Sequence, residues 1–232
     1  MSHLLVDLVD ATTRREVLVP LAGPALPGLL DVPEQPRGLV VFAHGSGSGY
    51  RSPRNAMVAE HLNQHGLATL RFDLLTAREG DQRELVFDIP LLADRLRTAT
   101  VWSATQPGLE GLPLGYFGAS TGAAAALVVA ADPHMPVRAL VSRGGRPDLA
   151  GGFLPKVTAP TLLIVGGQDD RVVGLNGVAL EHLNGPKRLV IVPGATHLFE
   201  EPGALEQVAE LAAGWFDRYL LASAVDAPRH HH

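Results

Sequence analysis

The chain has 232 residues, which suits one compact domain. It contains no cysteine, so disulfides, thiolate catalysis and cysteine-bound metals are excluded. The net charge is -5 and the basic residues are scattered, so we expect no nucleic-acid partner. The longest apolar stretch, residues 123–131, falls far short of the ~18 residues that cross a bilayer, so we expect no membrane segment.

The N-terminal segment is not expected to be a signal peptide. Asp7 and Asp10 interrupt the apolar residues near the N-terminus, and no basic segment precedes them, which is unlike a signal peptide. The three histidines at positions 230–232 look like a tag remnant, so we set residues 227–232 aside. We therefore expect a cytoplasmic protein with a single domain over residues 1–226.

Short apolar segments recur along the chain and predict strands. Residues 16–20 and 26–32 predict a short antiparallel hairpin at the start. Further strands are predicted at residues 39–43, 67–72, 114–117, 137–141, 161–165 and 188–192. Continuously apolar strands of this length are typical of a sheet that is covered on both faces.

Helical segments alternate with these strands. A helix over 55–65 should end at Gly66, and one over 89–103 should begin after Asp88, a good N-cap. Further helices are predicted over 121–131 and around residues 205–216. The alternation predicts an α/β fold with a mostly parallel, doubly wound sheet of about eight strands. Residues 74–86 form the one long loop, too short for a large lid.

The sequence Gly118-Ala119-Ser120-Thr121-Gly122 is a G-x-S-x-G motif. It directly follows a predicted strand and directly precedes a predicted helix. This context is typical of a nucleophile elbow, a sharp turn that exposes the serine hydroxyl above the sheet. The alternative is a glycine-rich turn in which Ser120 only caps the helix. The context favours the elbow, so we predict that Ser120 is a nucleophile.

A nucleophilic serine needs a base, and the base needs a carboxylate that orients it. Of the histidines that follow Ser120, His134 lies at the wrong edge of the sheet and His182 lies inside a helix. His197 follows the strand over 188–192, at the edge where open α/β sheets place their active sites. We therefore predict that His197 is the base.

The acid should come before the histidine, after the strand over 161–165. Both Asp169 and Asp170 stand there and both could reach His197. Asp169 is preferred because it lies nearer the end of the strand. Asp170 is then interpreted as a solvated turn residue beside Arg171.

The loop His44-Gly45-Ser46-Gly47-Ser48-Gly49 follows the strand over 39–43. Acyl transfer needs two backbone N–H groups that stabilise an oxyanion. We predict that these are the amides of Ser46 and of Thr121, the residue after the nucleophile. His44 is expected to brace the loop and not to transfer protons.

Two other interpretations of this region are weaker. A strand followed by a G-x-G loop resembles a dinucleotide-binding fingerprint, but Tyr50 replaces its third glycine and Pro53 stands where the helix should open. His61 and His65 have the i, i+4 spacing of zinc ligands, but Leu62 replaces the glutamate that such a motif needs. We expect neither a metal nor another cofactor.

Four arginines fall in loops that follow strand ends: Arg51, Arg54, Arg143 and Arg146. One interpretation is that they bind a carboxylate or phosphate of the substrate. The equally weighted alternative is that they pair with acidic residues, namely Asp148, Glu79 or Asp81.

With these residues in place, the chain resembles the dienelactone hydrolase-like branch of the α/β-hydrolases. The resemblance runs from about residue 16 onward and is carried, in the family's order, by FAHGSGSG, GYFGASTGAAAAL, LLIVGGQDD and VPGATHLFEEPG. It implies the α/β-hydrolase fold, and the family's G-x-D-x-x-V spacing supports Asp169 as the acid. Dienelactone hydrolases use a cysteine nucleophile, whereas this chain has Ser120, which points toward a general carboxylesterase.

The sequence thus predicts a serine hydrolase that cleaves small-molecule carboxylic esters through Ser120, His197 and Asp169. Two alternatives stay open: a non-catalytic ligand-binding module on the same fold, and thioesterase or dienelactone hydrolase activity. The sequence does not define the oligomeric state.

Overall fold

The computed structural model describes residues 12–21 and 23–221. The N-terminal segment that was compared with a signal peptide lies largely outside the described residues, and the tail at 227–232 lies wholly outside them. The limits of the expected domain, 1–226, therefore stay a prediction.

One eight-stranded sheet runs through the structure, in the order β1-β2-β4-β3-β5-β6-β7-β8. The strands are β1 (Thr13–Val19), β2 (Leu26–Val32), β3 (Gly38–Ala43), β4 (Leu67–Phe72), β5 (Leu114–Ala119), β6 (Val137–Arg143), β7 (Thr161–Gly166) and β8 (Lys187–Val192). The β1–β2 and β2–β4 pairs are antiparallel. The other five neighbouring pairs, β4–β3, β3–β5, β5–β6, β6–β7 and β7–β8, are parallel. The predicted mostly parallel sheet with an antiparallel start is confirmed.

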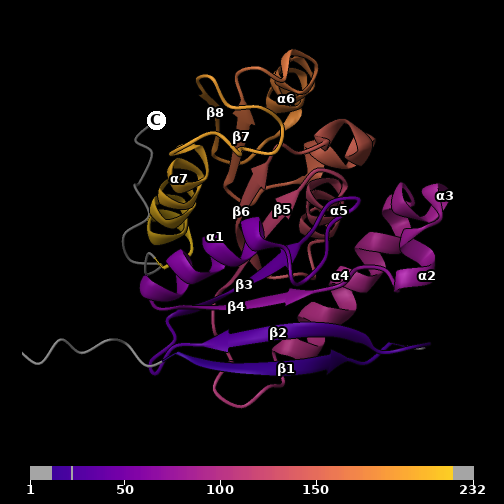
Figure 1. Cartoon of the computed structure of the whole chain (residues 1–232), viewed down its shortest axis with the longest axis vertical. Coiled ribbons are helices and arrows are strands. Elements are labelled where there is room, and N and C mark those ends of the chain that lie inside the picture. The colour runs from indigo at the N-terminus through magenta and orange to yellow at the C-terminus, as the bar shows by residue number, and fades with distance from the viewer. Residues whose placement is uncertain (1–11, 22, 222–232) are drawn as a thin grey trace, which may run out of the picture.

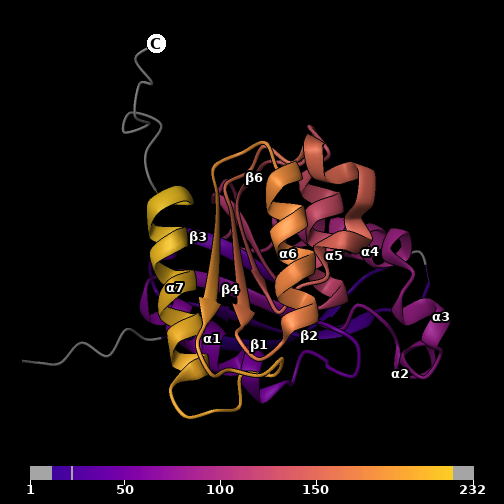
Figure 2. The same cartoon turned by 90° about the horizontal axis from the view of Figure 1, so that it is seen from above.

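Helices cover both faces of this sheet (Figures 1 and 2). On one face α1 (Pro53–Gln64) packs against α7 (Ala204–Tyr219). On the other lie α4 (Ile89–Ser103), α5 (Thr121–Ala130), α6 (Asp170–His182) and a 3₁₀ segment, η1 (Pro147–Lys156). The doubly wound arrangement follows from right-handed crossovers between parallel strands.

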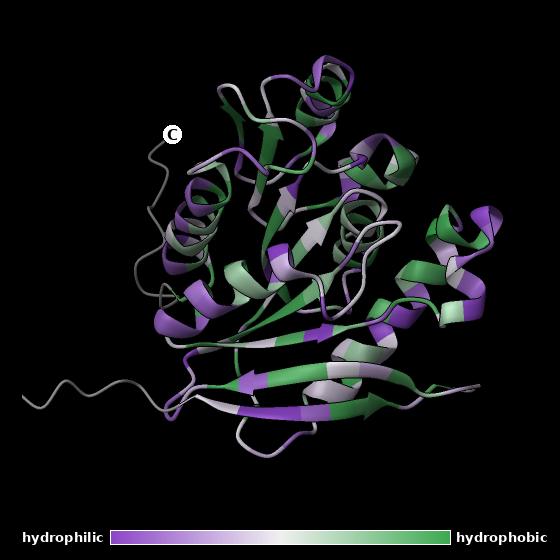
Figure 3. Ribbon diagram, in the orientation of Figure 1, coloured by the Kyte–Doolittle hydropathy of each residue, from purple (hydrophilic) through white to green (hydrophobic). Residues whose placement is uncertain are grey.

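Two apolar layers fill the space between the sheet and its helices. One includes Leu70, Tyr116 and Leu127, and the other includes Phe42, Phe117 and Phe216. Strands β3 and β7 are apolar along their length, whereas β4 and β6 carry the buried Arg71 and Arg143. Helices α1 and α7 mix hydrophilic and hydrophobic residues (Figure 3). The helix signals in the sequence also hold: Asp88 Oδ1 accepts the Leu91 N–H at 3.0 Å, and Gly66 takes a positive φ after α1.

The segment 74–86, expected as a loop, contains two single-turn helices, α2 (Ala77–Gly80) and α3 (Arg83–Val86). They project beside α4 (Figure 1). A capping box begins α2, because Thr76 Oγ1 accepts the Glu79 N–H while the Glu79 carboxylate accepts the Thr76 N–H. The sequence contains this capping-box signal as Thr76-x-x-Glu79, but a helix of four residues is too short to show a helical pattern of apolar residues.

In the part of the chain that the structure describes, no helix is both long enough and apolar enough to span a bilayer.

Candidate active site

Ser120 stands between the end of β5 and the start of α5 with φ 49° and ψ −123°. This is an unusual conformation for a residue with a side chain, and such strain is typical of functional turns. The Ser120 side chain makes no capping hydrogen bond to α5, which disfavours the interpretation of Ser120 as a mere cap. Its carbonyl oxygen accepts N–H groups from Ala123 and Arg146, at 3.2 and 3.1 Å. The backbone is therefore fixed while the hydroxyl is left free of the helix.

The two glycines of the motif make this turn possible. A Cβ at position 122 would overlap the carbonyl oxygens of Ala43 and His44, and one at position 118 would come within 2.5 Å of the Ala123 Cα. The first turn of α5 thus packs directly against the end of β3. Only residues without a side chain fit this approach.

His197 and Asp169 are in contact: the His197 Nδ1 and Asp169 Oδ2 atoms lie 2.6 Å apart. Asp169 follows β7 and His197 follows β8. The two loops are joined because the Gln168 N–H donates to the Ala195 carbonyl at 3.0 Å. Asp170 is the first residue of α6 and is exposed.

The end of β6 links this pair to Ser120. A Cβ at Gly144 would lie 3.4 Å from His197 Cε1, so the imidazole packs over this glycine. Two residues later, the Arg146 N–H binds the Ser120 carbonyl. The three residues predicted for catalysis therefore gather at the carboxyl edge of the sheet, around the ends of β5 to β8.

His44 anchors the loop after β3. Its Nε2 accepts the Leu74 N–H at 2.8 Å, and its Nδ1 lies 2.9 Å from the Gly45 carbonyl. A backbone N–H can only donate, so Nε2 must be unprotonated and Nδ1 must carry the hydrogen. Burial lowers the pKa of His44, which favours this neutral form. The geometry fits the expected bracing role.

A cavity of about 280 Å³ opens beside this loop. Residues 44–49 and Thr121 form one wall, so the residues predicted to supply the oxyanion donors, Ser46 and Thr121, border the same space. The opposite wall comes from the end of β4 and the α2–α3 segment, including Asp73, Thr76 and Asp81.

Comparison with known proteins identifies the family. A family model described as "Alpha/beta hydrolase domain" matches residues 36–211. A dienelactone hydrolase from Anabaena variabilis has a crystal structure that is 55% identical, with a TM-score of 0.86 over 90% of this chain and 99% of that one. The chain is a dienelactone hydrolase-like α/β-hydrolase. Est1E from Butyrivibrio proteoclasticus, 18% identical with a TM-score of 0.75 over 88% of this chain and 98% of that one, shares the fold.

Two proteins of Mycobacterium tuberculosis H37Rv are also similar to this hydrolase. Rv0571c, named a putative phosphoribosyl transferase, is 61% identical over 212 residues. The match covers 91% of this chain but only 48% of Rv0571c, so the chain spans about half the length of that relative. The uncharacterized protein Rv2307c is 31% identical over 268 residues, covering 95% of this chain and 92% of Rv2307c.

Three of the four loop arginines of the hydrolase pair with carboxylates. The ion pairs are Arg51–Glu16 at 2.9 Å, Arg54–Glu200 at 3.2 Å and Arg146–Asp148 at 2.7 Å. Pairing with Asp148 was the alternative that the sequence left open for this cluster. Glu79 instead binds Arg95 at 2.7 Å, a clamp that holds α2 against α4.

Arg143 behaves differently from the other three. It is buried, and its Nη2 lies 3.5 Å from Asn55 Oδ1. Burial, reinforced by the nearby charge of Arg54, lowers the pKa of Arg143 to about 10. Over residues 12–21 and 23–221, the lining of the cavity includes none of the four arginines.

His61 and His65 lie beside acidic residues of α7. His61 Nε2 lies 3.5 Å from Glu210 Oε1, and His65 Nδ1 lies 3.2 Å from Asp217 Oδ2. Among the described residues, no three potential ligands are grouped to hold a metal ion.

Sequence reasoning missed the acidic side of the cavity. Asp73 directly follows β4, and its Oδ1 accepts the Tyr50 N–H at 2.8 Å. Asp81 is exposed at the end of α2. Asp73 could have been predicted to border the site, because it directly follows a strand at the carboxyl edge of the sheet. Asp81 borders the cavity only because of how α2 and α3 fold, which the sequence pattern does not indicate.

Proposed function

We propose that this α/β-hydrolase cleaves carboxylic esters through a Ser120–His197–Asp169 triad and an acyl-enzyme intermediate. The observation that carries the proposal is the His197–Asp169 contact of 2.6 Å beside the strained turn at Ser120. A serine nucleophile needs a base that is oriented by a third group, and this arrangement supplies both.

In the first half of the reaction the Ser120 hydroxyl oxygen attacks the ester carbonyl carbon. Its proton passes to His197 Nε2, and Asp169 holds the imidazole in the tautomer with hydrogen on Nδ1. The amides of Ser46 and Thr121 stabilise the negative charge on the carbonyl oxygen. When the carbon–oxygen bond breaks, His197 returns the proton to the leaving alkoxide.

In the second half, His197 takes a proton from water, which attacks the acyl-enzyme carbonyl. The carbon–Ser120 bond breaks, and the proton returns to the serine oxygen. Every proton has a donor and an acceptor among the substrate, water and these side chains, so no cofactor enters the proposal.

The cavity is bordered by Ser46 and Thr121 and not by Ser120, Asp169 or His197, so it would hold a part of the ester next to the reacting carbonyl, and it favours a neutral or cationic group there. Its walls carry two carboxylates, Asp73 and Asp81, and in the described part of the chain no arginine or lysine. A carboxylate placed in this space would be repelled by both. A volume of about 280 Å³ lies just below the usual range for small-molecule sites, which also favours a small group.

Rv0571c carries a transferase name and is about twice as long as the matched region. We assign the hydrolase chemistry to the half that this chain matches.

The nucleophile is tested with a fluorophosphonate probe and a panel of p-nitrophenyl esters of increasing acyl length. We expect the wild-type protein to be labelled and to turn over the short esters. Ser120→Ala should lose both, with turnover at least ~10⁴-fold lower, as for triad deletions in general. A folded wild-type protein that is neither labelled nor active would favour the ligand-binding module. Equal activity in Ser120→Ala would refute the nucleophile.

A further inference from the structure

The loop that holds Ser46 is fixed mainly from outside itself. Gly45, Gly47 and Gly49 interrupt it, and Gly47 takes a φ of 67°. A loop with so many glycines has many alternative conformations. Its amides keep one direction only where other parts of the protein hold the chain.

The anchors come from the end of β4. The Leu74 N–H binds the His44 ring at the beginning of the loop. Near the other end, both main-chain groups of Tyr50 are bound: its N–H donates to Asp73 Oδ1 at 2.8 Å, and its carbonyl accepts from Arg71 Nη1 at 3.3 Å. The loop is thus held at both ends by residues 71–74.

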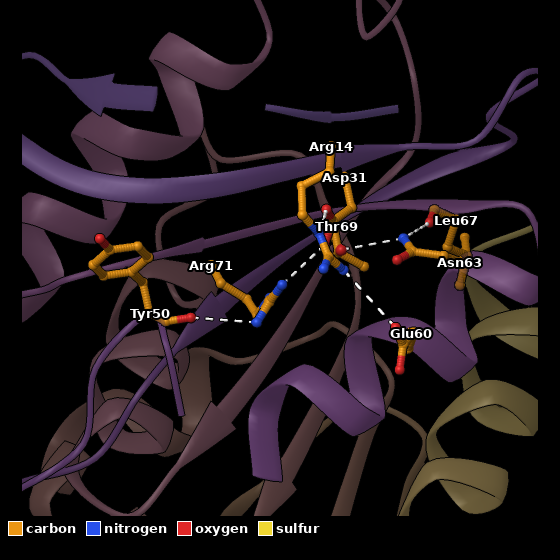
Figure 4. Close-up of polar contacts among 8 residues, drawn as sticks. All are labelled: Arg14, Asp31, Tyr50, Glu60, Asn63, Leu67, Thr69 and Arg71. Carbon is orange, nitrogen blue, oxygen red and sulfur yellow. Dashed lines mark hydrogen bonds and ion pairs between the residues drawn. The ribbon is translucent and has the colours of Figure 1, made fainter. Parts of the chain in front are cut away.

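Arg71 is buried in β4, and its charge is balanced from the neighbouring strand. Arg71 Nη2 lies 3.0 Å from Asp31 Oδ2 in β2, and Asp31 is completely buried. Figure 4 shows the guanidinium between Asp31 on one side and the Tyr50 carbonyl on the other. Because the guanidinium is planar and bound at two of its nitrogens, it sets where the Tyr50 carbonyl lies relative to β2.

Arg14 from β1 provides a natural comparison. Its Nε lies 2.6 Å from Asp31 Oδ1, so Asp31 binds two guanidiniums. The Arg14 side chain is 52% exposed, and its second contact is with Glu60 at 4.0 Å. Of the two arginines, only Arg71 contacts the loop.

Stability alone is a poor reason for this buried pair. Replacing a buried ion pair with apolar side chains is often neutral or stabilising, whereas removing one partner is costly. The arginine buried in β4 is therefore better explained by a need to orient the groups that its guanidinium binds.

We infer that Asp31 and Arg71 are positioning residues for the oxyanion loop: through Tyr50 they fix the direction of the Ser46 amide. Two hydrogen-bonded turns connect Tyr50 with the part of the loop that holds Ser46: the Ser48 N–H binds the Gly45 carbonyl at 3.3 Å, and the Ser52 N–H binds the Gly49 carbonyl at 3.0 Å. The inference rests on the proposed function, because it assigns a catalytic task to the Ser46 N–H.

The test compares Arg71→Met with Arg14→Met, because both remove one guanidinium from Asp31. We expect both variants to be less stable than the wild type. In Arg71→Met, kcat for a p-nitrophenyl ester should fall by roughly 10- to 100-fold, the scale of a misplaced catalytic group, while KM changes by less than about threefold. In Arg14→Met, kcat should stay within about twofold of wild type.

The double variant Asp31→Leu/Arg71→Met covers the case in which Arg71→Met does not fold. It leaves no buried charge unpaired, so it should fold, as judged by circular dichroism and Tm, and still show the low kcat. Equal kcat in the Arg71 and Arg14 variants, whether both high or both low, would overturn the positioning role. Ser120→Ala is measured alongside: turnover that survives it refutes the proposed function, whereas turnover that it abolishes but Arg71→Met leaves unchanged refutes only the positioning role.

Discussion

Gly122→Ala is expected to damage both the stability and the activity of this hydrolase. The added Cβ would overlap the carbonyl oxygens of Ala43 and His44. These are backbone atoms at the end of a central strand, so they cannot rotate away as a flexible side chain would. Relief requires α5 to move away from β3, and this motion would disturb both Ser120 and the loop that begins at His44.

The size of the effect follows from the nature of the overlap. Overpacking costs about 1–3 kcal/mol in general, and rigid neighbours place this variant near ~3 kcal/mol. For a protein of 150–250 residues that corresponds to a Tm lower by roughly 6–12 °C. Gly177→Ala in α6 is the matched control, because its Cβ would meet nothing within 4 Å. There the same methyl group should stabilise by about 0.5–1 kcal/mol.

Differential scanning calorimetry gives the two Tm values, and turnover of a p-nitrophenyl ester gives the activities. Gly177→Ala should match or exceed the wild-type Tm with full activity. Gly122→Ala with a wild-type Tm and wild-type turnover would refute the close approach of α5 to β3.

Three further outcomes are expected. Asp169→Asn should lower kcat by roughly 10⁴-fold because an amide favours the wrong imidazole tautomer, whereas Asp170→Asn should be nearly silent; the reverse ranking would move the acid to Asp170. Because burial lowers the pKa of folded His44, the contribution of His44 to the unfolding free energy should be fully present above about pH 6.5 and be lost as the pH falls below it, where the unfolded chain takes up the proton first. A chemical-denaturation series over this pH range should show a smaller fall in His44→Gln. A choline ester and its neutral 3,3-dimethylbutyl analogue should both have a higher kcat/KM than a hemisuccinate ester. Asp81→Asn should reduce the difference in kcat/KM between these two esters and the hemisuccinate, whereas Asp94→Asn should not. A higher kcat/KM for the hemisuccinate would contradict the argument from the charge of the cavity.

Local patterns in the sequence determined the architecture. Continuously apolar strands alternating with amphipathic helices predicted a doubly wound sheet, because each face of such a sheet must be covered. The G-x-S-x-G motif between a strand and a helix predicted the strained turn at Ser120. These features depend on neighbours within one element, so they can be seen along the chain.

Only the tertiary structure decided which side chains meet. Asp169 and Asp170 are adjacent and chemically identical, and the start of α6 separates the one that contacts His197 from the one exposed to solvent. The Arg71–Asp31 pair joins residues that are 40 positions apart. Such partners are set by the order of strands in the sheet and by the register of their pairing, which no local pattern records.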